Sequence, residues 1–195
     1  MLKSISFVFP LLLFKKNDIL NSSESQVSAA RHAICILYPS SLDSNVQGLV
    51  SFSQQNISSP TQIVATIKGL NPNQLHGFHI HEFGDLTKGC DTAGPHYNPY
   101  NKKQGGPLDS ERHVGDLGNI KSDGQGNGYL AISDNLIKLF GENSVLGRSC
   151  VVHRDEDDLG RGGQADSMTT GHAGPRVACG TIGLSSSFKN LAPSQ

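Results

Sequence analysis

The chain has 195 residues, which is enough for one domain of ordinary size with a well-buried core. Its formal net charge of −1 gives no bulk electrostatic reason to expect nucleic acid or an acidic membrane as a partner. Hydrophobic residues make up 36% of the chain, a low share for an α/β enzyme, and its 22 glycines favour an all-β fold with long loops.

The N-terminal segment differs in character from the rest of the chain. Lys3 precedes an apolar run, Ile5–Phe14, which is too short to span a bilayer as a helix but has the length of the apolar part of a signal peptide. The best small-residue cleavage pattern, Val27–Ala29, lies well beyond that run, after Lys15 and Lys16. Two interpretations remain open: a signal peptide of an extracellular protein, or an uncleaved extension of a cytoplasmic one.

Short strand-like runs alternate with turn signals from Arg31 onward. The runs that predict strands are Ala33–Tyr38, Val46–Phe52, Gln62–Ile67, Leu75–Glu82, Tyr129–Ser133, Val145–His153 and Arg176–Leu184. Two long polar stretches, Phe83–Gly118 and Arg154–Pro175, separate some of them, and loops of that length are usually functional. The pattern predicts a β-sandwich or barrel of about eight strands that carries two long loops.

This pattern also divides the chain. We expect residues 1–30 to form the separate N-terminal segment, residues 31–187 to form a single domain, and residues 188–195 to form a short tail.

Two histidines stand on the strand predicted at Leu75–Glu82. Because side chains alternate along a strand, His79 and His81 leave one face while Phe78 and Ile80 leave the other. This spacing lets two imidazoles reach one metal ion. Taken alone, a His-x-His pair is a weak signal, and two surface or core histidines are the simpler interpretation.

Other candidate ligands follow along the chain. His96 lies in the first long loop, and His113 and Asp116 follow across a glycine turn, where imidazole and carboxylate both suit zinc. His153 ends a predicted strand. The remaining histidines have no comparable setting, and we expect structural or solvated roles for His32, His76 and His172.

The motifs around these residues resemble the signature of the Cu/Zn superoxide dismutases, in that family's order and spacing from about Ala33 to Leu184. The matching segments are Gly77–Asp85, Gly89–Pro107, Arg112–Gly118, Val151–His153, Asp157–Gly160 and Gly174–Gly183. The resemblance implies an eight-stranded Greek-key β-barrel, an immunoglobulin-like sandwich with two long functional loops, and usually a homodimer. It also implies an enzyme that converts two superoxide anions into O2 and H2O2 by cycling a histidine-bound copper.

The resemblance assigns metal ligands residue by residue. The copper ligands that match are His79, His81, His96 and His153, and four nitrogen donors suit copper in both of its oxidation states. His96 also matches the residue that bridges copper to zinc and carries a proton during turnover. The matching zinc ligands are His96, His113 and Asp116, and Asp157 matches a carboxylate that links the two sites and fixes ring orientation.

Two further features are implied by the same match. Arg176 matches an arginine beside copper that guides the anionic substrate, and a permanent cation there attracts and orients superoxide. The four cysteines allow three pairings by sequence alone. The resemblance selects a disulfide between Cys90 and Cys179, and Cys35 and Cys150 are expected to be buried free thiols.

The chain departs from the family pattern at Gln104, where the family carries one more zinc histidine. A neutral amide oxygen is a poorer zinc ligand than imidazole, so we expect a weakened zinc site. The amide N–H can still reach Asp157 if the amide oxygen faces zinc. Thr169 stands where many members have a lysine that helps steering, and His172 stands where asparagine is common, so we expect weaker steering.

The main alternative is a copper-binding or copper-delivery module without useful turnover. Relatives of that kind often lose copper ligands, whereas this chain keeps all four copper histidines and Arg176. We therefore expect copper and zinc as cofactors and superoxide as the substrate. We expect a homodimer, and neither nucleic acid nor membrane as a partner.

Overall fold

The structure is a computed structural model that describes residues 30–191 of the chain. The predicted N-terminal segment lies outside the described residues except for its last position, and residues 192–195 of the predicted tail also lie outside them. No helix in the described part of the chain has both the length and the apolar character needed to cross a membrane.

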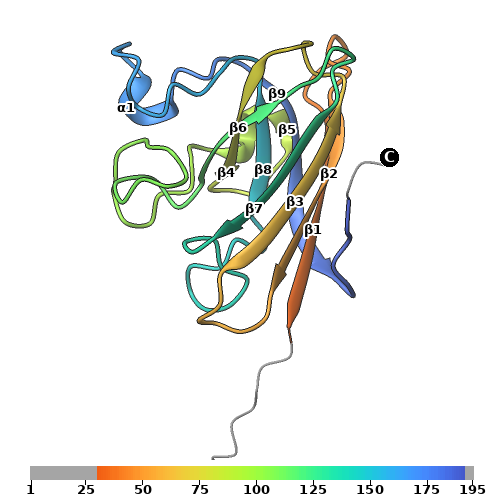
Figure 1. The fold of residues 1–195 in the computed structure, drawn as a ribbon, viewed down its shortest axis with the longest axis vertical. Helices are drawn as coiled ribbons and strands as arrows, with labels where there is room; N and C mark the ends of the chain where they lie inside the picture. The colour runs from red at the N-terminus through yellow and green to blue at the C-terminus, as the bar shows by residue number, and fades with distance from the viewer. Residues whose placement is uncertain (1–29, 192–195) are drawn as a thin grey trace, which may run out of the picture.

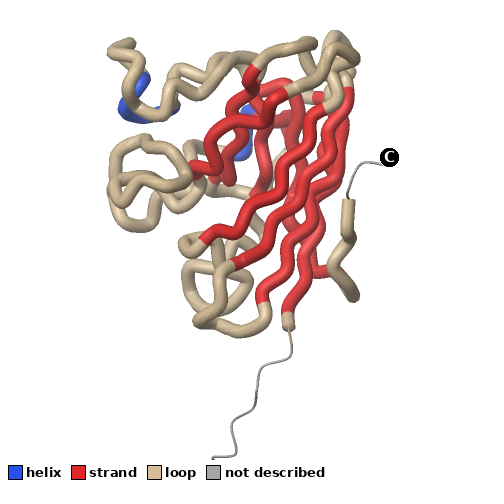
Figure 2. The backbone as a smooth tube through the Cα atoms, in the orientation of Figure 1, coloured by secondary structure: helices blue, strands red, loops and turns tan. Residues whose placement is uncertain are grey.

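Antiparallel strands make up most of the regular structure (Figures 1 and 2). In chain order they are β1 (Arg31–Pro39), β2 (Gln47–Gln54), β3 (Thr61–Lys68), β4 (Leu75–His81), β5 (Thr87–Cys90), β6 (Asp116–Lys121), β7 (Gly128–Asp134), β8 (Ser149–His153) and β9 (Arg176–Ser185). Eight of them form one sheet in the order β6-β4-β8-β9-β1-β2-β3-β7. A bridge between Ser122 and Gly128 brings the two edge strands together, so the sheet curls into a nearly closed barrel. The predicted all-β, eight-stranded Greek-key barrel is confirmed.

The barrel core forms from the side chains that the strands turn inward. Phe78 and Ile80 of β4 lie in this core with Val152 of β8, and all three are fully buried. The two-residue period of β4 then turns His79 and His81 to the outer face. The strand therefore stabilises the barrel with one face and presents two imidazoles on the other.

Two long segments cover that outer face. Residues 94–115 follow a 3-10 turn at Asp91–Ala93, and residues 154–175 contain the short helix α1 (Ser167–Thr170). In Figure 1 both segments lie on the side of the barrel that carries β4, β6 and β8, away from β1, β2 and β3. His79 and His81 are consequently buried although they point away from the barrel core.

One strand lies where the sequence pattern predicts no strand. β6 begins at Asp116, and its buried residues Leu117 and Ile120 are three positions apart instead of two. Gly118 between them has φ 74°, a left-handed conformation that interrupts the alternation of the strand. The strand therefore carries no two-residue period for sequence analysis to detect. The short strand β5 likewise falls inside the predicted loop.

The strand predicted at Val145–His153 is shorter than expected. The Arg148 N–H donates back to the Val145 carbonyl oxygen, and Gly147 between them has φ 79°. These residues form a turn, so β8 begins only at Ser149. In the part of the predicted strand that forms this turn, only Val145 is buried, and Gly147 is exposed.

Candidate metal centre

Four histidines meet on the outer face of the barrel. β4 supplies His79 and His81, β8 supplies His153, and the first long segment supplies His96, which forms a bridge with His81. One ring nitrogen of each residue lies within 4.8 Å of the others, and all four residues are buried. The structure thus brings together the four residues that the sequence predicts as copper ligands.

Backbone carbonyls orient two of these rings. His81 Nδ1 lies 2.8 Å from the Gly94 oxygen, and His153 Nδ1 lies 2.9 Å from the Gly174 oxygen. A carbonyl oxygen only accepts hydrogen bonds, so each Nδ1 carries the proton and each neutral ring keeps a bare lone pair on Nε2. The two Nε2 atoms face each other at 3.4 Å. Two lone pairs at that distance repel unless a cation lies between them.

His79 and His96 complete the cluster. His79 Nε2 lies 2.9 Å from Asp157 Oδ2, which places the ring proton on Nε2 and leaves Nδ1 bare. His79 Nδ1 and His96 Nε2 are both buried without a hydrogen-bond partner. Buried polar atoms without partners are costly, and convergent bare imidazole nitrogens suit copper. The residues present therefore fit a copper ion.

Burial keeps these imidazoles neutral. Removal from water penalises the charged imidazolium, which lowers the pKa of His79 and of His81 well below the ordinary histidine value. The same effect lowers the pKa of His153 to about 4. Because the neutral ring is the form that binds a metal, these three residues do not need to lose a proton near neutral pH before they bind one.

The other ring nitrogen of His96 belongs to a second cluster. His96 Nδ1 and His113 Nδ1 lie 3.1 and 3.0 Å from the same atom, Asp116 Oδ1. The other carboxylate oxygen of Asp116 accepts hydrogen bonds from the backbone N–H groups of Gly105 and His113. Burial by itself raises the pKa of Asp116, but the hydrogen bonds from His113 and His96 outweigh it and lower that pKa. An ionised carboxylate with two imidazoles is a donor set that suits zinc.

Arg112 holds this second cluster against the barrel. Its buried guanidinium donates to the backbone oxygen of Asp116 and forms an ion pair with Asp134 at the end of β7. Sequence analysis did not assign Arg112 a role, because nothing in its motif shows that its partner lies on another strand.

The side chain of Gln104 lies between the two clusters. Its Oε1 is 2.9 Å from His96 Nδ1, and its Nε2 donates to Asp157 Oδ2 at 2.9 Å. Only 4% of the residue is exposed. The amide oxygen therefore faces the predicted zinc ligands, and the amide N–H makes the contact with Asp157 that the sequence left conditional.

Asp157 in turn is held by groups outside the clusters. Its Oδ1 accepts a hydrogen bond from the Leu159 N–H, and its backbone N–H and C=O pair with the side-chain amide of Asn119 on β6. Burial raises the pKa of Asp157 to about 7, and hydrogen bonds from Leu159 and Gln104 oppose that shift. Sequence analysis missed Asn119, because the strand that carries it has no detectable pattern.

Arg176 lies beside the first cluster. It is paired with His153 in the register of β8 and β9. Its guanidinium donates to the backbone oxygens of Cys90 and Gly94, each at 2.6 Å, and the Gly94 oxygen is also the partner of His81. The positive charge is therefore held next to the histidines, at the position where the resemblance places it.

The cysteines divide into one bridge and two free thiols. A disulfide joins Cys90 to Cys179 and so ties the end of β5 to β9. Cys35 and Cys150 are free and buried. This is the pairing that the family resemblance implies. Burial, together with a hydrogen bond to Cys35, raises the pKa of the Cys150 thiol well above its ordinary value.

A surface cavity of about 890 Å³ reaches the metal centre. Its wall includes His96 and His113, together with Lys102, Lys103 and Thr169. The cavity joins the two long segments and brings solvent next to the histidine that the two clusters share. Thr169, one of the residues that depart from the family pattern, therefore lines the same cavity as His96 and His113.

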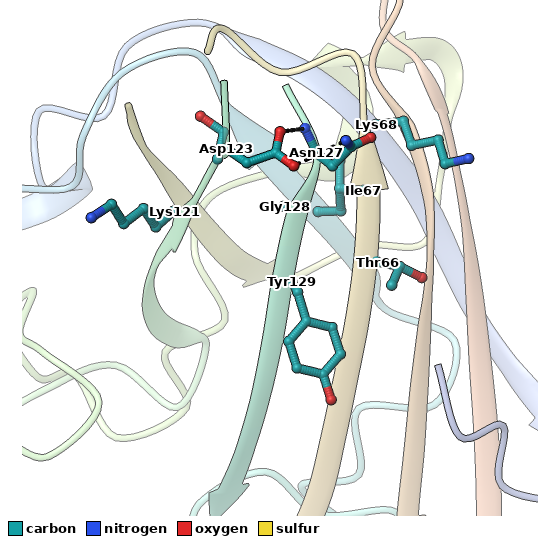
Figure 3. A pocket seen from close by; sticks show the side chains of 9 residues that line it. Thr66, Ile67, Lys68, Lys121, Asp123, Asn127, Gly128 and Tyr129 are labelled. Carbon is teal, nitrogen blue, oxygen red and sulfur yellow. Dashed lines mark hydrogen bonds between the residues drawn. The ribbon is translucent and has the colours of Figure 1, made fainter. Parts of the chain in front are cut away.

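A second pocket has no connection with these clusters. It measures about 660 Å³ and lies at the end of β3, β6 and β7, where Figure 3 shows Lys68, Lys121 and Tyr129 around a hydrogen-bonded pair, Asp123 and Asn127. No histidine lines it. Nothing in its lining relates it to metal chemistry.

Two histidines that the sequence assigns to other roles lie outside both clusters. His76 is buried, and its ring contacts the backbone oxygens of His153 and Asn71. His172 is exposed and pairs with Asp166. Their partners are those of a structural and a solvated histidine respectively.

Comparison with known proteins adds an independent finding. The family model described as copper/zinc superoxide dismutase matches residues 46–182. The chain is 58% identical over 142 residues to the Cu-Zn superoxide dismutase of Yarrowia lipolytica, covering 73% of this chain and 92% of that protein. It is 59% identical over 142 residues to the enzyme of Candida albicans, with the same coverage of 73% and 92%. It is 54% identical over 152 residues to that of Cordyceps militaris, covering 78% and 97%.

Proposed function

The chain belongs to the copper/zinc superoxide dismutase family, and we propose which of its residues carry out the conversion of two superoxide anions into O2 and H2O2. The copper ligands are His79, His81, His96 and His153. The observation that carries this assignment is the pair of buried, partnerless nitrogens on His79 and His96. Copper bound there supplies the one-electron oxidation and reduction that the reaction needs.

His96 is the residue placed to move a proton. Its Nε2 faces the copper-side cluster, and its Nδ1 faces the second cluster. The nearby cavity gives water access to this histidine. When Nε2 is not engaged by a metal, it can hold a proton at the place where superoxide is reduced, and H2O2 formation requires two protons.

Arg176 attracts and orients the substrate. It keeps its charge at every relevant pH, and its hydrogen bonds to the backbone oxygens of Cys90 and Gly94 hold the guanidinium beside His81. A fixed cation at a partly enclosed site raises the local concentration of a small anion. This chain has the uncharged Thr169 in the wall of the cavity, where many family members have a lysine. Attraction of the substrate therefore depends more heavily on Arg176.

The second site binds zinc through His96, His113 and Asp116, with Gln104 as a poorer fourth donor. Family membership supports zinc as a cofactor in general, and the weakening follows from ligand chemistry. Zinc retained after dialysis against a mild chelator tests this. Gln104→His is expected to retain more zinc than the native chain, and equal retention would contradict the weakening.

We also propose a homodimer that uses the outer face of β1 and its surroundings. Large apolar side chains are exposed there on β1, on β9 and just after β4: Ile36, Tyr38, Leu184 and Phe83. Exposed apolar residues that gather on one face favour association. Sedimentation of the native chain and of Ile36→Glu tests this, because a charge in that face is expected to shift the protein to monomer.

The domain limits are part of the same proposal. The family match over residues 46–182 supports an enzymatic domain at 31–187, with 1–30 and 188–195 as the flanking segment and tail. A chain restricted to 31–187 is expected to keep its copper content and its activity.

The decisive experiment compares copper-loaded protein with the metal-free form. The copper-loaded protein is expected to remove superoxide catalytically, whereas a copper-delivery module would hold copper and transfer it to an acceptor protein without turnover. If copper-loaded protein removes superoxide no faster than the metal-free form, the proposed residue roles are wrong.

A further inference from the structure

Gln104 is the one side chain in the described structure that hydrogen-bonds to both His96 and Asp157. His96 contributes a nitrogen to each cluster, and Asp157 holds His79. A continuous series of three contacts, each 2.9 Å long, therefore runs from His96 through Gln104 and Asp157 to His79. All four residues are buried, which limits competition from water for these contacts.

The chemistry of the Gln104 amide determines how the side chain is oriented. A carboxylate accepts hydrogen bonds, so the amide N–H group must face Asp157 and the amide oxygen must face His96. Gln104 thus has one donor end and one acceptor end that do not exchange roles. An imidazole at this position would likewise direct an N–H to Asp157 and keep its lone pair on the other nitrogen.

The backbone around Gln104 ties it to the other long segment. The Gln104 N–H donates to the Met168 carbonyl oxygen. Gly171 has φ +63°, and a side chain there would collide with the carboxylate of Asp157 and press on the Gln104 amide. The two long segments are therefore closely packed around the amide.

We propose that Gln104 is a positioning residue that couples His96 to His79 by hydrogen bonds alone, so that the copper-side histidines keep their arrangement when the second site holds no metal. This inference rests on the proposed role of His79 and His96 as copper ligands.

The test measures copper(II) affinity, by competition with a chelator, and the EPR spectrum of bound copper, in zinc-free and zinc-loaded protein. In the native chain, zinc is expected to change copper affinity by less than about threefold and to leave the EPR spectrum nearly unchanged. Gln104→Met has a similar length but neither hydrogen-bonding end, and it is expected to bind copper about 10–100-fold more weakly.

Two further variants make the result specific. Gln104→His keeps a donor for Asp157 and an acceptor for His96, so it is expected to bind copper about as tightly as the native chain, which also shows that a folded protein is being compared. Gln164→Met is the matched control, because it makes the same change at an exposed glutamine of the second long segment. It is expected to behave as the native chain does.

The inference is overturned if zinc strengthens copper binding tenfold or more in the native chain, or if Gln104→Met binds copper as tightly as the native chain does. Either result leaves the proposed function standing, provided that copper-loaded protein is active. An EPR spectrum without nitrogen ligation in zinc-loaded native protein would instead contradict the copper ligands themselves, and this inference with them.

Discussion

The two halves of the metal centre share His96 but are held in different ways. On the copper side, the second nitrogens of His79, His81 and His153 all contact acceptors outside the cluster: a carboxylate and two backbone carbonyls. On the zinc side, the nitrogens of His96 and His113 contact Asp116, which is itself a predicted ligand. The copper-side rings are therefore held by acceptors outside their cluster, whereas the zinc-side rings are held by Asp116, a member of their own cluster.

This difference bears on how each half binds a metal. The copper-side lone pairs already point inward without protons, so a cation completes an arrangement that exists. On the zinc side, the hydrogen bonds among the donors must break, and their protons must leave, before a metal enters. The copper half is therefore preorganised, and the second half exchanges internal hydrogen bonds for metal bonds.

The largest expected effect comes from removing one ligand on each side. His81→Ala is expected to lower copper affinity and activity by at least about 100-fold, because even outer contacts of metal ligands are worth 10–100-fold. His113→Ala is expected to lower activity by less than about tenfold, because the copper-side rings keep their own acceptors. Copper content and superoxide removal measure both variants.

A control variant removes a histidine outside both clusters. His172→Ala is expected to match the native chain, since that residue is exposed and pairs with Asp166. Equal losses in His81→Ala and His113→Ala would remove the distinction between the two halves.

The next largest expected effect comes from breaking the disulfide that ties the end of β5 to β9. The disulfide between Cys90 and Cys179 ties down the chain next to Gly94, the partner of His81. Replacing both cysteines with serine is expected to lower the free energy of unfolding by about 2–4 kcal/mol. Urea denaturation measures this, and peptide mapping under non-reducing conditions checks the pairing.

The zinc-side segment offers the matched comparison. Within this segment, Lys102 and Glu111 form an exposed ion pair. Glu111→Gln is expected to change stability by less than about 1 kcal/mol, as surface ion pairs do. A disulfide variant as stable as the Glu111 variant would show that the covalent link contributes nothing to the stability of the fold.

Arg176→Ala tests the substrate's approach to the copper side. Loss of the charge is expected to lower the rate by about tenfold at low salt and to weaken its dependence on ionic strength, since salt screens over about 10 Å at 0.1 M. Arg176→Lys keeps the charge and is expected to keep the salt dependence. An unchanged rate at low salt in Arg176→Ala would show that this arginine does not steer.

The smallest effect comes from adding charge to the cavity wall. Thr169→Lys is expected to raise the rate about twofold at low salt, because a unit charge about 10 Å away in water contributes about 0.4 kcal/mol. Thr66→Lys makes the same change in the pocket of Figure 3 and is expected to leave the rate unchanged. If the rate rises equally in both variants, the increase comes from the net charge of the protein and not from the position of the lysine in the cavity.

Local sequence patterns were sufficient to predict a strand where buried side chains alternate with side chains on the other face. The alternation in β4 predicted that Phe78 and Ile80 share one face and that His79 and His81 share the other, and the structure places the first pair in the core. The same reasoning failed for β6, because the left-handed Gly118 removes the two-residue period on which such a prediction depends. A strand whose buried and exposed side chains do not alternate can be recognised only from its backbone hydrogen bonds in the structure.

The sequence by itself determined the donor types and their order along the chain, and with them the family and the all-β barrel, because residue chemistry and strand period are local properties. The tertiary structure alone decided which nitrogen of each histidine is bare and which way the amide of Gln104 points. Gln104 is 53 residues from Asp157, and His79 is 78 residues from it. Contacts over such separations depend on how the two long segments pack on the barrel, and no local pattern carries that information.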